Sequence, residues 1–111
     1  MNAPEPTPAA GPALTMVAAL HVLLAQHPEL TAYPIRWSVG EGDGITAIAR
    51  DAHPAAGRVA DLLAATLDSE VTGSERTRQD GTRVLTRFVT AELAGFRFFF
   101  SGDVPVEGGA E

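Results

Sequence analysis

"AELAGFRFFFSG", residues 91–102, carries the clearest strand and turn signals of the chain. Within this stretch, Ala94-Gly95 is followed by four of the five phenylalanines of the chain, which all lie within five positions. Turn residues between two apolar runs are typical of a two-residue hairpin loop between antiparallel strands. We therefore expect Leu93 to face Phe96 and Val89 to face Phe100 across a tight hairpin.

This register sorts the side chains of the hairpin onto two faces, because successive strand residues point to opposite sides of a sheet. One face is wholly apolar, and it carries Val89, Ala91, Leu93, Phe96, Phe98 and Phe100. The other face carries Thr90, Glu92, Arg97 and Phe99, with opposite charges at Glu92 and Arg97 facing each other. A slip of one residue would destroy both patterns. We predict that three of the clustered phenylalanines are buried and that Phe99 points away from the core.

The remaining segments predict an α+β domain around this hairpin. Apolar residues at helical spacing predict a first helix from Ala13 to about His27, and a second helix that begins after Pro54. Alternation predicts strands at 33–39 and 45–50, joined by the turn "GEGDG", and three strands between residues 69 and 104. The expected fold is two-layered, in the order αββαβββ, with a mostly antiparallel five-stranded sheet and two helices on one face. The first helix is expected to bury one apolar stripe, made of Leu14, Val17, Leu20 and Leu24 with Met16 and Leu23.

Length and composition indicate one domain with two short tails. A chain of 111 residues supports a single hydrophobic core. Residues 1–11 alternate proline with small or acidic residues, so we expect a disordered tail there, a domain at 12–104 and a flexible acidic tail at 105–111. The chain has no cysteine, which excludes a disulfide framework, a thiolate metal site and a cysteine nucleophile.

Charge and hydropathy narrow the possible partners. The net charge of −6 disfavours nucleic acid and anionic membranes, because contacts of Lys and Arg with phosphate supply most of that affinity. The apolar segment 13–25 is shorter than the roughly 20 residues of a membrane span, and no Lys or Arg precedes it as in a signal peptide. We expect a cytoplasmic protein that makes no membrane contact.

The basic residues of the chain are all arginine, and they follow the predicted strands. Seven of the eight lie in strand segments, Arg58 being the exception. If Asp80-Gly81 forms a two-residue loop, it pairs its flanking strands so that four arginines share one face. Those arginines are Arg76, Arg78, Arg83 and Arg87.

The direction of two of these arginines depends on the regularity of the fourth strand. Strict alternation backwards from Val89 would turn Arg83 and Arg87 toward the core, which is costly without paired carboxylates. We therefore expect a β-bulge near Phe88 that turns both arginines outward. The alternative is a three-residue turn at residues 79–81, which would split the arginines between the two faces.

An arginine-rich sheet face has two interpretations. Arginine on an exposed face increases solubility and discourages pairing of sheet edges. The same residues also bind anions and protein partners. The sequence leaves both interpretations open.

The motifs of common catalytic and metal sites are missing. "GEGDG", residues 40–44, lacks the Lys-Ser/Thr of a phosphate-binding loop and has too few oxygen ligands for a calcium loop. The three histidines have no metal-binding spacing, and His27 and His53 precede prolines at helix boundaries, where we expect them either to satisfy helix ends or to be exposed to solvent. No serine lies in a nucleophile elbow. We therefore expect no enzyme activity, no cofactor and no metal.

Two resemblances bear on function. "GFRFFF" partly matches the first RNA-binding motif of RRM domains, but Ala94 and Arg97 depart from that motif and the element order differs from βαββαβ. "HPEL" after an alanine-rich helix, the turn "RQDGTRV" and "ELAGFRFFF" together resemble small uncharacterised proteins of actinobacteria, some encoded on phage-like or integrative elements. The second resemblance covers roughly residues 14–104 and implies no activity and no site residue.

Together these features predict a non-enzymatic protein–protein interaction module that forms a homodimer through the open sheet face. Aromatic residues and arginine are enriched at such interfaces. Phe99 is the expected anchor, surrounded by Arg97, Arg87, Arg83, Arg78 and Arg76. The alternative is that the same face binds nucleic acid or another anionic ligand.

Overall fold

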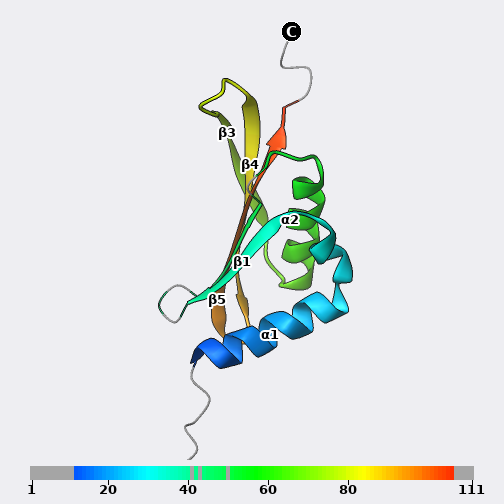
Figure 1. Ribbon diagram of the computed structural model, residues 1–111, viewed down its shortest axis with the longest axis vertical. Coiled ribbons are helices and arrows are strands. Elements are labelled where there is room, and N and C mark those ends of the chain that lie inside the picture. The colour runs from blue at the N-terminus through cyan, green and yellow to red at the C-terminus, as the bar shows by residue number, and fades with distance from the viewer. Residues whose placement is uncertain (1–11, 41, 43, 50, 107–111) are drawn as a thin grey trace, which may run out of the picture.

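The computed structural model describes residues 12–40, 42, 44–49 and 51–106, and its elements follow the predicted order (Figure 1). They are α1 (Pro12–Gln26), the 3-10 helix η1 (Pro28–Ala32), β1 (Ile35–Gly40), β2 (Gly44–Ala49), α2 (Ala55–Thr66), β3 (Val71–Thr77), β4 (Arg83–Leu93) and β5 (Phe96–Pro105). The predicted α+β class is confirmed. The predicted tail at 1–11, part of the turn at 40–44, residue 50 of the second strand and residues 107–111 lie outside the described residues.

The five strands form one mixed sheet in the order β1-β2-β5-β4-β3. Neighbouring strands are antiparallel except β2 and β5, which are parallel. Both helices pack on the same face, because Met16 of α1 and Leu63 of α2 share one core cluster with Phe98 and Phe100 of β5. In Figure 1, α2 lies along the sheet and α1 runs across it near one end. We call the sheet surface on the opposite side the open face.

The hairpin of β4 and β5 has the predicted register. Leu93 pairs with Phe96 and the pairing continues without interruption to Val84 and Pro105. Phe98 and Phe100 are fully buried, whereas Phe99 is half-buried on the open face. The loop residues Ala94 and Gly95 have φ angles of 54° and 84°, the positive values that a two-residue hairpin loop of this type requires. Glycine adopts such angles freely, whereas alanine is strained there.

Helix α2 approaches the sheet closely at Gly102. A Cβ atom at this position would lie 2.8 Å from the Phe100 ring and 3.0 Å from the Ala56 Cβ atom. The beginning of α2 is held by His53, whose Nδ1 accepts a hydrogen bond of 2.9 Å from the Ala55 N–H. This confirms the prediction that His53 satisfies a helix end.

The predicted stripe of α1 is wrong at two positions. Met16, Leu20 and Leu23 are buried, but Leu14 and Val17 are 61% and 49% exposed. Apolar residues surround this helix on every side, so their spacing does not identify the face that packs on the sheet.

The predicted β-bulge and the predicted two-residue loop are also wrong. Pairing of β4 with both β3 and β5 is continuous, so alternation is strict along the whole strand. Arg78 pairs with Thr82 through a hydrogen bond of 2.8 Å from its N–H to the Thr82 oxygen, which leaves a three-residue loop at residues 79–81. Gly81 closes this loop with a φ of 89°. The loop is the alternative considered above, and it splits the arginines between the two faces as expected.

Candidate functional site

The six predicted site residues lie on two surfaces. Phe99 and Arg97 are on the open face, where Arg76 and Arg78 also contact a carboxylate. Arg83 and Arg87 are on the helix side of the sheet, because strict alternation places them on the same side as Val89. The prediction of one continuous arginine face is therefore wrong.

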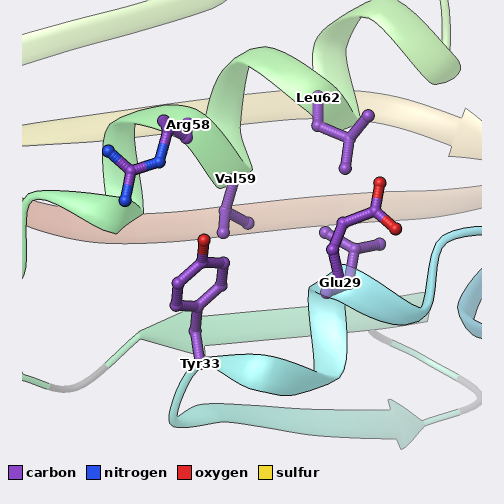
Figure 2. A pocket seen from close by; sticks show the side chains of 6 residues that line it. Glu29, Tyr33, Arg58, Val59 and Leu62 are labelled. Atoms are coloured by element: carbon purple, nitrogen blue, oxygen red, sulfur yellow. The ribbon is translucent and has the colours of Figure 1, made fainter.

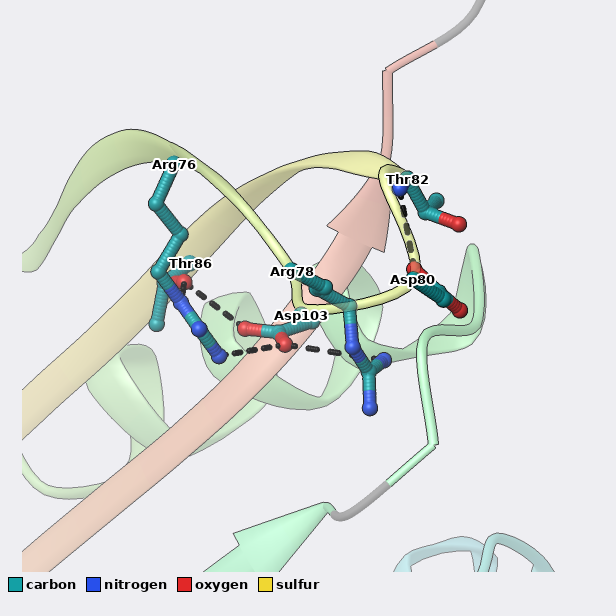
Figure 3. A network of polar contacts seen from close by, with 6 residues as sticks. All are labelled: Arg76, Arg78, Asp80, Thr82, Thr86 and Asp103. Carbon is teal, nitrogen blue, oxygen red and sulfur yellow. Dashed lines mark hydrogen bonds and ion pairs between the residues drawn. The ribbon is translucent and has the colours of Figure 1, made fainter.

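A buried polar network fills the part of the open face near the β3–β4 loop (Figure 3). Thr86 and Asp103 pair across β4 and β5 and are 3% and 5% exposed. The Thr86 hydroxyl donates a hydrogen bond of 2.7 Å to Asp103 Oδ1, and Arg76 Nη2 donates one of 2.8 Å to Asp103 Oδ2. Arg78 Nη1 lies 3.7 Å from the same carboxylate oxygen. Two guanidinium groups thus neutralise one buried carboxylate, as a buried charge requires.

The two arginines on the helix side also have carboxylate neighbours. Arg83 Nη2 donates a hydrogen bond of 2.7 Å to Glu75 Oε1, and Arg87 Nη2 lies 3.7 Å from Asp61 Oδ1 on α2. Arg83 is 53% exposed, so its charge on this side of the sheet costs little, and Asp61 offsets part of the cost for Arg87, which is 30% exposed. The offset is incomplete, because the buried Nε of Arg87 has no hydrogen-bond partner among the described residues.

A shallow cavity of about 480 Å³ lies beside the network and is lined by Arg76, Arg78, Gln79 and Asp80. Asp80 accepts a hydrogen bond of 2.9 Å from the Thr82 N–H, and this bond lowers the pKa of its carboxyl group below the usual value. The cavity therefore contains an ionised carboxylate, and Asp103 lies next to it. An anion entering this cavity would meet two negative groups as well as two arginines.

The remainder of the open face is mostly hydroxyl-bearing, with one aromatic pair. Phe88 and Phe99 lie with ring centroids 6.0 Å apart, a distance typical of favourable aromatic contacts. Both rings are half-buried. Thr90 pairs with Phe99 and Ser101 pairs with Phe88, so the aromatic pair is small and its surroundings are polar.

The largest exposed apolar side chains lie elsewhere, on α1. Among the described residues, the exposed large hydrophobics are Leu14, Val17 and Val22, which are 61%, 49% and 50% exposed. We define the outer face of α1 as six of its exposed residues, Leu14, Val17, Ala18, His21, Val22 and Ala25; Thr15 and Gln26 of this helix are also exposed. The helix "PALTMVAALHVLLAQ" contains no charged residue. Sequence reasoning missed this surface, although the absence of charge around a whole helix was the signal for it.

A second cavity, of about 250 Å³, lies between η1 and α2 (Figure 2). Figure 2 shows the Tyr33 hydroxyl directed toward Val59, with the carboxylate of Glu29 below Leu62 and Arg58 at the far side. The volume of this second cavity is below the range of about 300–1,000 Å³ that is usual for ligand pockets.

No group of three or more His, Asp or Glu residues in the described part of the chain is arranged to hold a metal ion. No helix within the described ranges is both long and apolar enough to span a bilayer. Comparisons with protein-family models, with curated proteins and with solved structures found no match. The resemblance to actinobacterial proteins therefore stays a prediction.

Proposed function

We propose that this protein is a non-enzymatic protein–protein interaction module that works as a homodimer. The observation that carries the proposal is the outer face of α1, where Leu14, Val17 and Val22 are each about half exposed or more on a helix without charge. Exposed large apolar side chains gathered on one element are typical of association surfaces. Water contact with these side chains is unfavourable, at roughly 25 cal/mol per Å² of apolar surface, so association that covers them is favoured.

Two surfaces offer apolar contact for this association. The open face offers Phe88 and Phe99, which are half-buried and surrounded by threonine and serine. The outer face of α1 offers more exposed apolar side chains and no competing charge. The second surface is therefore the better candidate, although the sequence pointed to the first.

Anion binding by the arginines has less support than self-association. Arg76, Arg78, Arg83 and Arg87 each lie within 4 Å of a carboxylate oxygen. A phosphate group would compete with these carboxylates on a chain whose net charge is −6.

Sedimentation equilibrium at low and high salt tests the proposal. An apolar interface is screened little by salt, so the account expects a dimer in both conditions. A monomer in both conditions would refute the proposed function. A dimer that dissociates at high salt would also contradict it, because ionic contacts would then hold the two copies together.

A further inference from the structure

We infer that two copies of this chain meet through the outer faces of their α1 helices, packed antiparallel, with Ala18 of each copy opposite His21 of the other. The inference rests on the proposed homodimer and names the surface and the arrangement that form it. In a two-fold symmetric contact, residue i of one copy meets residue j of the other and j meets i. A helix that forms such a contact must therefore be complementary to its own reversed copy.

The outer face of α1 meets this requirement. With Ala18 opposite His21, the same register places Leu14 opposite Ala25, and Val17 and Val22 lie on the two flanks of this contact; all six residues are exposed. The leucine thus meets an alanine and the imidazole meets a methyl group, while the two valines border the contact on either side. A parallel pair would instead place Leu14 against Leu14 and Ala25 against Ala25, which leaves contacts too crowded at one end and too open at the other.

Electrostatics favours the same arrangement. Two copies of a chain with a net charge of −6 repel each other on average, and α1 is a 15-residue helix without charged side chains. Contact at this helix brings no like-charged side chains of α1 together. Antiparallel packing also places the positive N-terminal end of each helix dipole beside the negative C-terminal end of the other.

Other occupants of this face fit less well. Residues 1–11, which precede α1, contain one large apolar residue, Met1, and so cannot match Leu14, Val17 and Val22. A membrane surface is disfavoured because helices that lie on anionic membranes carry Lys or Arg along their polar side, and α1 has neither. A second copy supplies apolar side chains in matching positions.

Disulfide cross-linking tests the arrangement, and the chain has no native cysteine to interfere. The double variant L14C/A25C should form a covalent dimer on mild oxidation, because each new thiol faces its counterpart in the other copy. Positions 14 and 25 are about 16 Å apart along the helix axis, so neither single variant should cross-link and the double variant should not close within one chain. Efficient cross-linking of L14C alone would show a parallel pair and overturn the inference.

A charge placed at the centre of the contact between the two α1 helices provides a second test. Ala18→Glu should convert the dimer to a monomer at concentrations where the wild type is dimeric, because it desolvates two carboxylates at the centre of the contact. The matched control is Ala65→Glu, which makes the same change at an exposed position of α2 and should leave the dimer intact. Circular dichroism establishes that both variants are folded.

The outcomes separate the inference from the proposed function. If the wild type and Ala18→Glu are both dimers and L14C/A25C does not cross-link, the inference is overturned and the homodimer is kept. Loss of that dimer in Phe99→Asp would then assign the contact to the open face. A monomeric wild type would overturn both.

Discussion

Replacing Phe98 and Phe99 by alanine, one at a time, provides a matched test of the strand register. The two residues are adjacent and chemically identical, but they point to opposite faces. Phe98 is fully buried, lies beside Trp37 with ring centroids 6.5 Å apart, and belongs to the core cluster. Removing a buried phenylalanine ring costs about 3–5 kcal/mol, through lost burial and the cavity left behind.

Phe99→Ala should cost much less. It loses a half-buried ring and the contact with Phe88, and an aromatic pair of this kind contributes about 0.5–1.5 kcal/mol. Urea unfolding at one protein concentration measures both variants. With a slope of about 1–3 kcal/mol per M urea, the midpoint of Phe98→Ala should lie at least about 0.5 M below that of Phe99→Ala. Equal losses would show that the register is wrong.

Three further predictions follow from local geometry. Gly102→Ala should lower the free energy of unfolding by about 1–3 kcal/mol, because its Cβ would press on Phe100 and Ala56, and an unchanged urea midpoint would contradict this packing. Ala94→Gly should raise stability by about 1 kcal/mol, because it relieves a φ of 54°, and thermal unfolding that shows a loss would contradict the loop. Asp80→Ala should lower stability at neutral pH. The folded state depresses the pKa of Asp80, so the stabilisation is present above the ordinary pKa and disappears as the pH falls through the folded one. A difference from wild type that persists at strongly acidic pH would refute this role of the carboxylate.

The β4–β5 hairpin could be predicted from sequence because apolar residues mark one of its faces. Val89 and Phe98 belong to the apolar face of the hairpin. A register slip of one residue would place polar residues among them, so sequence alone selects one pairing. The order of elements followed from helical spacing, alternation and turn residues. The parallel pairing of β2 with β5 could not be predicted in the same way, because it joins segments about 50 residues apart.

In the β3–β4 hairpin, apolar residues do not identify one face of the strands in this way. Its residues are mostly threonine, serine, glutamate and arginine, which fit either face, and Asp80-Gly81 fits a loop of two or three residues. The burial of Asp103 depends on the arginines that cover it from β3 and the β3–β4 loop. A polar residue that is buried by partners distant in sequence has the same local pattern as an exposed one.

The outer face of α1 shows the opposite difficulty. Its residues are apolar like those of the buried face, so periodicity could not separate Leu14 from Met16. The packing of α1 on the sheet decides which residues face water. A helix that is apolar on every side and covered on one side only is itself the reason to expect a partner.

Light scattering shows whether the uncharged helix α1 joins two copies of this chain. Wild type and Ala18→Glu are compared side by side on a size-exclusion column. We expect twice the mass of one chain for the wild type and the mass of a single folded chain for the variant. Equal masses for the two proteins, whether monomeric or dimeric, would contradict it.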